Sequence, residues 1–357
     1  MSIIDEFKEA TEPVEVNYDE LISTLEIDIS KPVKQPESII DINGEVWGTL
    51  GGLSVVMGKA KTKKTFFVTA ATAAMLTSKS VLGMTGKLPV GKRKILYFDT
   101  EQSEYHVSKV GQRVCKMAEL PPTTDRFRIF KLNPISTKKR LGLIDHVFKT
   151  VENIDMVGVV IIDGIRDLLF DINNSTEATE LVDYIRKWTD TTNTHIITVL
   201  HANKTDGNLR GHIGTELLNK GETILEVVID GQDKNISVVS CERSRNKPFE
   251  DFAFSINDAG IPVVCDMPVK SEKKVFDVEE QIGADAIVKI LVKAYNNRNE
   301  PKTKSELKDI FSLKVKIKDA KARLIVAYCV DKQYIENVSN NKKNYKYVLN
   351  DWVGVSV

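Results

Sequence analysis

The chain has 357 residues, of which 42% are apolar, and its 50 basic residues balance its 50 acidic residues. This length and composition fit one large domain with a buried core and a second, smaller domain. The sequence contains no run of about 18 or more apolar residues, which excludes a membrane-spanning helix.

The cysteines and the N-terminal residues indicate a reducing compartment. The four cysteines lie far apart and form no C-x-x-C pair, so neither a metal cluster nor a disulfide framework is expected. The first residues, MSIIDEFKEATEPVEV, are acidic and polar, unlike a signal peptide. We therefore expect a cytoplasmic protein with no membrane partner.

The charge is distributed unevenly along the chain. Residues 1–45 hold twelve acidic and three basic residues, a net charge of −9, and residues 301–349 hold twelve basic and five acidic residues, a net charge of +7. Each segment alone can be a solvated surface. Together, an acidic arm over residues 1–40 and a basic tail also suggest a partner contact at one end and nucleic acid at the other.

Short apolar runs alternate with helical patterns between about residues 50 and 265. Strands are expected over 53–58, 94–100, 126–132, 156–164 and 194–202, and helices over 64–78, about 103–118, 176–192 and between the third and fourth strands. This alternation predicts a parallel sheet covered on both faces. After about residue 220 four more strands follow one another across turns, in ETILEVVID, NISVVSCERS, DFAFSIND and IPVVCD. We expect them to be antiparallel strands added to one edge.

A second, smaller domain is expected after a linker at residues 269–280. Residues 281–357 begin with a helical pattern, and Thr303 and Glu306 form a capping box that marks the start of a second helix. A third helical pattern and two short strands joined by SNNKKN complete the segment. Three helices followed by two strands predict a winged helix-turn-helix domain, after an α/β domain over residues 41–268.

The segment VVMGKAKTKKTFF, residues 55–67, is close to the phosphate-binding loop G-x-x-x-x-G-K-[ST]. In such a loop, backbone N–H groups and a helix N-terminus point at the phosphates of a nucleotide. Lys64 would contact the β- and γ-phosphates, and Thr65 would bind Mg²⁺. Lys63 stands where the motif has its second glycine, so a basic strand–helix turn is the alternative. The residues of the loop are Gly58, Lys59, Ala60, Lys61, Thr62, Lys63, Lys64 and Thr65.

Polar residues follow three other strands of the predicted sheet, at the edge where open α/β folds bind ligands. Asp163 can hold a water of the Mg²⁺ shell, Glu101 in the group Asp99–Glu101 can orient the attacking water, and His201 can sense the γ-phosphate. Each residue alone has an ordinary structural explanation, such as a helix cap. Their occurrence in this order favours a nucleotide site.

These segments together resemble the RecA/DnaB superfamily of ATPases, and among them the RepA-like group of plasmids, phages and bacterial mobile elements. The resemblance rests on GTLGGLSVVMGKAKTKKTFF, ILYFDTEQS, VVIIDGIRDLL, VLHANK…RGHIGTELL and VVSCERSRNKPFEDFAFSI, and covers roughly residues 40–265. It implies a RecA-like P-loop fold, the cofactors ATP and Mg²⁺, and a catalytic set formed by Lys64, Glu101, Asp163, His201, Arg243 and Arg245. Thr65 and Asp163 match the metal positions, and the two arginines match a pair that contacts the neighbouring subunit's γ-phosphate. Lys63 departs from the family pattern.

Two regions could contact DNA. By the same resemblance, the loop KTDGNLRGHIGTE, residues 204–216, would face the central channel of a ring, with Lys204 and Arg210 as candidate contacts to single-stranded DNA. A solvated loop is the alternative. In the predicted winged helix, basic residues on the third helix and the wing would contact duplex phosphates, although such domains also bind proteins. The candidates there are Lys316, Lys318, Lys321, Lys342 and Lys343.

The sequence thus predicts an ATPase that acts on DNA as a ring, with six copies expected, for unwinding or translocation in a mobile element. Two alternatives remain open at this point. One is a recombinase-like ATPase that coats DNA. The other is a DNA-binding regulator whose altered phosphate loop binds nucleotide with little turnover.

Overall fold

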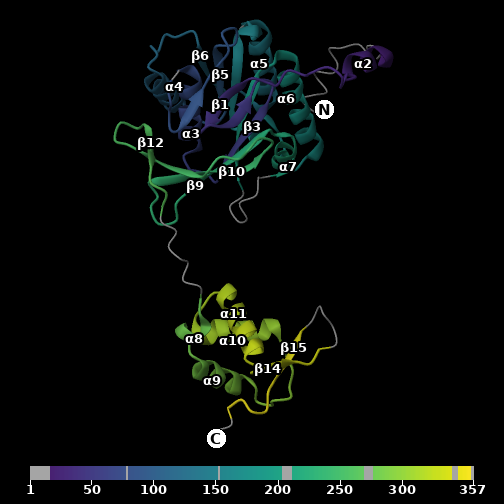
Figure 1. Cartoon of the computed structure of the whole chain (residues 1–357). Helices are drawn as coiled ribbons and strands as arrows, with labels where there is room; N and C mark the ends of the chain where they lie inside the picture. The colour runs from purple at the N-terminus through teal and green to yellow at the C-terminus, as the bar shows by residue number, and fades with distance from the viewer. Residues whose placement is uncertain are drawn as a thin grey trace. The chain divides into compact units, whose positions relative to one another are not determined.

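The computed structural model describes residues 17–77, 79–151, 153–202, 211–268, 276–339 and 345–354. The chain divides into two compact units, Met1–Pro268 and Val269–Val357 (Figure 1). None of the helices in these ranges has the length and apolar character that a bilayer crossing requires.

A nine-stranded sheet forms the centre of the first unit. Its strands, in spatial order, are β12 (Pro262–Cys265), β11 (Phe252–Ile256), β10 (Ile236–Ser244), β9 (Thr223–Ile229), β3 (Leu53–Gly58), β8 (His195–His201), β7 (Val157–Asp163), β5 (Lys94–Asp99) and β6 (Phe127–Lys131). The neighbours from β9 to β6 are parallel, and those from β9 to β12 are antiparallel. The parallel strands β3 and β7 are buried along their whole length, which explains their uninterrupted apolar sequences.

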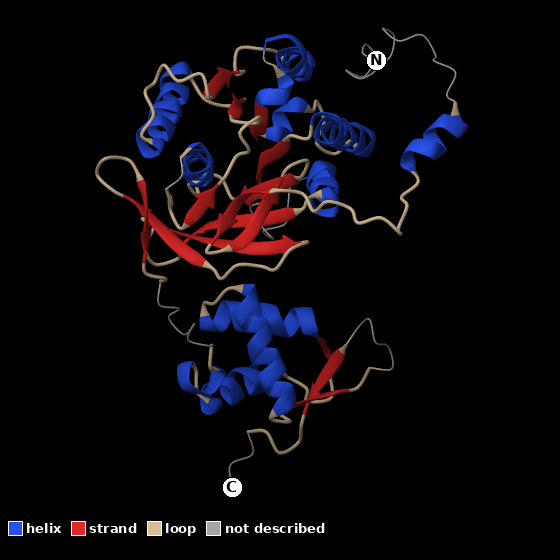
Figure 2. Ribbon diagram, turned by 45° about the horizontal axis from the view of Figure 1, so that its top comes forward, coloured by secondary structure: helices blue, strands red, loops and turns tan. Residues whose placement is uncertain are grey.

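Helices cover both faces of this sheet (Figure 2). One apolar core joins α3 (Lys64–Leu76) and α4 (Glu104–Ala118) to alternate strand residues such as Val56 and Tyr97. A second core joins the other set of strand residues to the helices of the opposite face, α5 (Thr137–His146), α6 (Ser175–Thr192) and α7 (Gly211–Lys220). Three short helical turns, η1 (Val147–Val151), η2 (Ile154–Met156) and η3 (Ile165–Leu168), lie in the connections. The α/β architecture predicted from the alternation is confirmed.

One prediction for the edge strands is wrong. The segment ETILEVVID forms β9, which pairs parallel to β3, from Ser54 opposite Thr223 to Met57 opposite Glu226. Only β10, β11 and β12 are antiparallel additions. The reason is that α7 connects β8 to β9, so β9 is the last strand that follows a crossover helix.

A small second sheet, with two strands before β3 and one after α3, was not predicted. It contains β1 (Ser38–Ile42), β2 (Glu45–Thr49) and β4 (Met84–Gly86), in the order β2-β1-β4. Trp47 of β2 stacks on Phe67 of α3 with ring centroids 5.4 Å apart, so this sheet covers the helix that follows the phosphate loop. Strand β1 also crosses residue 40, the boundary expected for the acidic arm. Within that arm, α2 (Tyr18–Leu25) is a two-turn helix.

The second unit is a helical domain with a three-stranded sheet. Its elements are α8 (Val278–Gln281), α9 (Ala284–Ala294), β13 (Lys302–Thr303), α10 (Lys304–Val315), α11 (Asp319–Asp331), β14 (Ile335–Asn337) and β15 (Lys346–Leu349), with the strands in the order β13-β15-β14. The helices and the sheet share one apolar core that includes Ile287, Phe311 and Leu349. The capping box between Thr303 and Glu306 at the start of α10 is confirmed.

Candidate functional site

The loop between β3 and α3 has positive φ at the two positions where the phosphate-binding motif has glycine, residues 58 and 63. Gly58 has φ +152°, and a Cβ atom there would lie 2.2 Å from the carbonyl oxygen of Val227, so only glycine fits. Lys63 has φ +68°, in the left-handed region that glycine adopts freely and that costs other residues about 1–2 kcal/mol. Residue 63 therefore has the backbone conformation that glycine favours, although it is a lysine.

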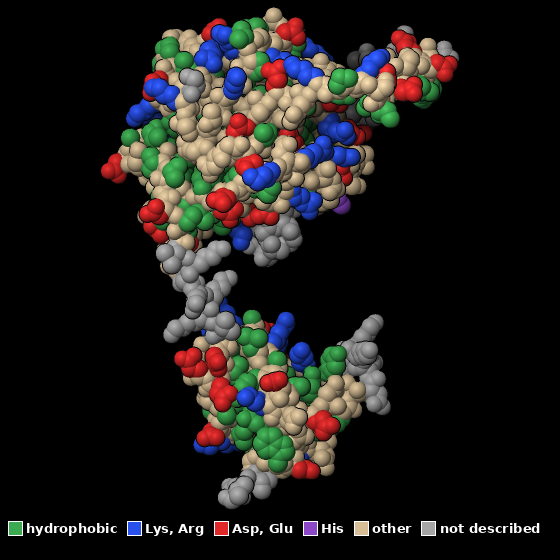
Figure 3. Space-filling model, in the orientation of Figure 1, with side chains coloured by type: hydrophobic (Ala, Val, Ile, Leu, Met, Phe, Trp, Pro, Cys, Tyr) green, Lys and Arg blue, Asp and Glu red, His purple; other side chains and the backbone are tan. Residues whose placement is uncertain are grey.

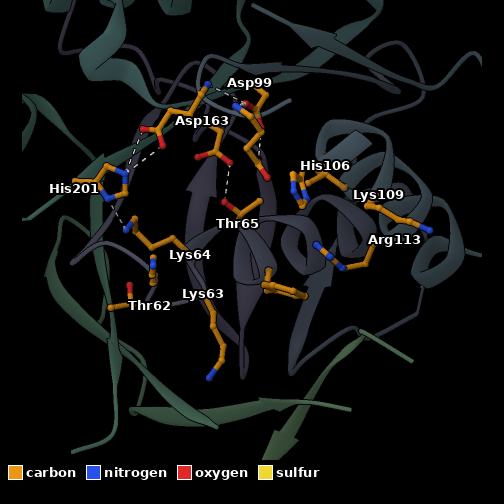
Figure 4. A pocket seen from close by; sticks show the side chains of 15 residues that line it. Thr62, Lys63, Lys64, Thr65, Asp99, His106, Lys109, Arg113, Asp163 and His201 are labelled. Atoms are coloured by element: carbon orange, nitrogen blue, oxygen red, sulfur yellow. Dashed lines mark hydrogen bonds and ion pairs between the residues drawn. The ribbon is translucent and has the colours of Figure 1, made fainter. Parts of the chain in front are cut away.

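The side chain of Lys63 is directed away from the other residues of the loop (Figure 4). Its Nζ donates hydrogen bonds to the carbonyl oxygen of Lys234, at 2.8 Å, and to Ser237 Oγ, at 3.4 Å. Burial lowers the pKa of the Lys63 amine. A lysine in place of glycine at position 63 therefore affects the conformational energy of the loop backbone more than it affects the space inside the loop.

Lys64 is buried at the first turn of α3. Its Nζ lies 2.8 Å from the carbonyl oxygens of Gly58 and Lys59 and 3.0 Å from His201 Nδ1. Burial lowers the pKa of Lys64 to about 8. An ammonium group has three N–H donors, and these three partners occupy them all. A phosphate oxygen that binds Lys64 must therefore replace one of them.

Thr65 and Asp163 form the second part of the site. Thr65 Oγ1 donates a hydrogen bond of 3.0 Å to Asp163 Oδ2, and Tyr97 Oη donates one of 2.7 Å to the same oxygen. Burial raises the pKa of Asp163 to about 6. The hydroxyl and the carboxylate offer the oxygen ligands that Mg²⁺ prefers, and Mg²⁺ needs only one or two protein ligands when phosphates and water supply the rest. The residues present fit a nucleotide-bound Mg²⁺.

Glu101 and His201 are in contact at the ends of β5 and β8, with His201 Nε2 3.2 Å from Glu101 Oε1. The hydrogen bond from His201 is the main cause that lowers the pKa of Glu101, so this carboxylate is charged at neutral pH. Neighbouring Asp99 has a different role. Its carboxylate accepts hydrogen bonds from the backbone N–H groups of Glu101 and Gln102, at 3.0 and 2.7 Å, and so holds the turn after β5.

These residues surround one cavity of about 440 Å³. Its lining includes residues of α3 and α4 that the sequence did not indicate, namely Phe66, His106, Lys109 and Arg113. The Arg113 guanidinium lies 3.8 Å from the centroid of the Phe66 ring, and its Nε donates a 3.0 Å hydrogen bond to the carbonyl oxygen of Gly260. His106, Lys109 and Arg113 are spaced i, i+3 and i+7 on α4, so they lie on one face of the helix. This spacing was the sequence signal that could have revealed this end of the cavity.

Comparison with known proteins agrees with this geometry. Residues 19–207, more than half of the 357-residue chain, match the protein family described as an AAA domain. The chain belongs to this family. The matched range contains the phosphate loop, Glu101, Asp163 and His201, and it supports a P-loop ATPase domain that hydrolyses nucleotides. No curated protein matches the chain.

Arg243 and Arg245 lie at the opposite end of the AAA domain's sheet from the phosphate loop. Strand β10 runs antiparallel to β9, and Ser244 pairs with Thr223, which pairs with Ser54 at the start of β3. Gly58 is four residues further along β3, or about 13 Å at the usual rise per residue. Both arginines are exposed, and a register shift between Cys241 and Arg243 interrupts the pairing of β10 with β9 just before them. They do not line the cavity formed by Lys64, Glu101 and Asp163 of their own chain.

Arg245 instead lines a second cavity of about 370 Å³, together with Arg186 of α6 and Lys220 of α7. Figure 3 shows Lys and Arg side chains gathered over these two helices. Of these three basic residues, Arg186 lies within the range that matches the AAA family, and Lys220 and Arg245 lie beyond it.

The candidate DNA contacts are only partly described. Lys204, Arg210, Lys342 and Lys343 lie outside the described residues. Lys316 ends α10 and Lys318 precedes α11, and both are exposed. Lys321 is also exposed, and its Nζ lies 4.7 Å from the centroid of the Phe276 ring.

Proposed function

We propose that this AAA-family protein is an ATP-hydrolysing motor that acts on DNA, a RepA- or DnaB-like helicase or translocase of a bacterial mobile element. One observation carries the proposal. Lys64, the Thr65–Asp163 pair and the Glu101–His201 pair converge on one cavity at the carboxyl edge of the parallel strands. These are the parts that transfer of a phosphoryl group to water requires.

The chemistry is hydrolysis of the β–γ bond of ATP. Water attacks the γ-phosphorus, the bond to the β–γ bridging oxygen breaks, and ADP and inorganic phosphate leave. Glu101 orients the water and accepts its hydrogen bond, and Lys64 holds the β- and γ-phosphates. Thr65 and Asp163 would hold Mg²⁺, which neutralises charge on the phosphates when it is bound.

The base and ribose occupy the end of the cavity formed by Phe66, His106 and Arg113. The phosphates take the end with the loop and the carboxylates, so the nucleoside extends toward α4. A guanidinium stacked on a phenyl ring presents its outer face to a planar base. The backbone contact from Arg113 to Gly260 restrains that guanidinium.

The working assembly is a ring, with six copies expected. Arg243 and Arg245 lie at the other end of the sheet, so they can complete only the nucleotide site of a neighbouring copy. Arginines supplied in this way stabilise the charge of the transition state. A basic edge that also includes Arg186 and Lys220 favours contact with a polyphosphate.

The second unit is proposed as a winged helix that binds duplex DNA through Lys316, Lys318, Lys321, Lys342 and Lys343. The order α9, β13, α10, α11, β14, β15 and the three-stranded sheet support this assignment. One observation favours protein docking as a second candidate. On α11, the third of these helices, Leu324 is 47% exposed and Val330 is 39% exposed, so part of the face available for recognition is apolar.

ATP hydrolysis with and without single-stranded DNA, measured with the particle mass in solution, tests the proposal. We expect DNA-stimulated turnover by a closed oligomer, and the Glu101→Gln variant should bind ATP without turnover because it keeps the shape of the side chain but not the charge. Nucleotide binding without hydrolysis by the unchanged protein would indicate the regulator instead. Filaments on DNA in electron micrographs would indicate the recombinase-like ATPase.

A further inference from the structure

Arg245 is attached to the sheet through the segment around Glu222. The backbone N–H of Arg245 donates a 2.9 Å hydrogen bond to the carbonyl oxygen of Glu222, and its Nη2 lies 3.3 Å from the carbonyl oxygen of Lys220. Arg245 lies one residue beyond the end of β10, where no strand pairing restrains it. Its position therefore depends on contacts at the junction of α7 and β9.

The carboxylate of Glu222 connects this segment to the rest of the fold. Its Oε1 accepts hydrogen bonds of 3.1 Å from Asn246 Nδ2 and from Thr49 Oγ1, and its Oε2 lies 3.3 Å from the backbone nitrogen of Thr49. The carboxylate thus joins the residue after Arg245 to the end of β2. The space around it is tight, because a Cβ atom on Gly52 would lie 2.1 Å from Oε2.

The partners of Glu222 are also chemically informative. All three donors are neutral, although the cavity that Glu222 lines also contains Arg186, Lys220 and Arg245. Among the described contacts, the Glu222 carboxylate accepts hydrogen bonds from these neutral donors and forms no ion pair with Arg245. The guanidinium can then present its remaining N–H groups to an anion outside the chain.

We propose that Glu222 is the positioning residue for Arg245, acting through Asn246 and Thr49. The inference rests on the proposed role of Arg245 at the nucleotide site of a neighbouring copy. Glu222 touches neither the nucleotide nor its own phosphate loop. It sets the position from which Arg245 extends across the contact between copies.

Two variants of the full-length protein test this role. Glu222→Ala and Asn246→Ala should both bind a fluorescent ATP analogue within about twofold of the unchanged protein, because their own phosphate loops are intact. Turnover should fall about tenfold or more, since an arginine supplied to a neighbouring site is worth about 10³–10⁵ in rate. Lys247→Ala is the matched control. Lys247 lies in the same segment but pairs with Glu45, so its loss should leave turnover unchanged.

Mixing experiments separate positioning from a general loss of structure. Glu222→Ala mixed with Lys64→Ala should regain turnover, because the first supplies intact phosphate loops and the second supplies correctly held arginines. Glu222→Ala mixed with Arg245→Ala should regain none, since both lack a functional arginine. Exchange of copies would be verified by energy transfer between fluorescent labels. Rescue by both partners, or by neither, would overturn the positioning role.

The outcomes also separate this inference from the proposed function. Slow turnover by Arg245→Ala with normal turnover by Glu222→Ala and Asn246→Ala would overturn the positioning role alone. Normal turnover by Arg245→Ala would overturn the role of the arginine itself, and the positioning role with it. If Glu222→Ala fails to fold, Asn246→Ala decides the question, because it removes one amide donor and leaves the bonds between Glu222 and Thr49.

Discussion

Two adjacent lysines in the phosphate loop have different surroundings, and substitution should separate their roles. Lys64→Ala removes the buried ammonium that lies beside Gly58, Lys59 and His201, so ATP turnover should be abolished. Lys63→Gly should leave turnover unchanged or raise it, because glycine adopts the left-handed backbone of position 63 without strain. Steady-state hydrolysis and thermal unfolding of both variants check this. Equal loss from the two substitutions would show that Lys63 also contacts the nucleotide.

The lowered pKa of Lys64 predicts how ATP binding depends on pH. Burial brings this pKa to about 8, whereas bound phosphates favour the ammonium and raise it. Binding above pH 8 must therefore take up a proton, and the association constant should fall as pH rises above 8, by up to about tenfold per pH unit. Below about pH 7 the Lys64 ammonium is already formed, so Lys64 should no longer make ATP binding depend on pH.

Calorimetry of MgATP binding at pH 8.5, in two buffers with different ionisation enthalpies, measures that proton uptake. The Lys64→Met variant is the control, because it has no group that titrates at this position. Uptake that persists in the variant would assign the proton to another residue. Identical heats in the two buffers for the unchanged protein would contradict the lowered pKa of Lys64.

At the scale of single elements, the central strands β5, β7 and β8 were predictable because each contains a continuous apolar run that ends in a polar residue. The direction of β9 was not, because its sequence resembles that of the antiparallel strands after it. The pairing of β1 with β2 had a local signal in Asn43-Gly44, which both have positive φ and form the hairpin turn. The third strand, β4, is about forty residues away, and no local pattern reports such a contact.

The residues of the candidate site were predictable to a similar extent. Glu101, Asp163 and His201 follow apolar strands, so topology alone placed them at one edge. Tyr97 lies inside the apolar run of β5, and its hydrogen bond to Asp163 exists only because β5 and β7 are neighbours, with Tyr97 paired to Ile161. The stacking of Arg113 on Phe66 depends likewise on the packing of α4 against α3. Sequence shows which residues an element carries, and tertiary packing decides which of them meet.

Helix α4 should determine nucleotide affinity through Arg113. Arg113→Ala removes both the stack on Phe66 and the hydrogen bond to Gly260, so the KM for ATP should rise about tenfold, which corresponds to about 1.4 kcal/mol, with a smaller change in kcat. Lys116→Ala, which removes a basic residue outside the main cavity on the same helix, should leave KM unchanged. Titration of the initial hydrolysis rate with ATP measures both constants. A fall in kcat at constant KM would instead place Arg113 in the chemical step.

At the scale of the whole molecule, the two units have separate apolar cores. The core of the second unit is formed from its own helices and strands. Arg298, in the connection between α9 and β13, also holds the C-terminal segment by donating to the carbonyl oxygens of Asn350 and Val353. Among the described residues, the two cores of the first unit extend no further along the chain than Ile256, which packs against one of them. Each unit therefore has the interior that independent folding requires.

Deletion of residues 270–357 should leave a folded ATPase that has lost its binding to duplex DNA. The basic residues of the second unit supply the phosphate contacts in the proposed winged helix, and such contacts release counterions. Duplex binding by the full-length protein should therefore weaken steeply with salt, whereas nucleotide binding by the truncated protein should match that of the full length. Fluorescence anisotropy with a labelled duplex at several salt concentrations measures this.

If both proteins bind the duplex equally, the exposed apolar residues Leu324 and Val330 would mark the second unit as a protein-docking domain. In that case Leu324→Glu should abolish its association with a partner and leave DNA binding intact.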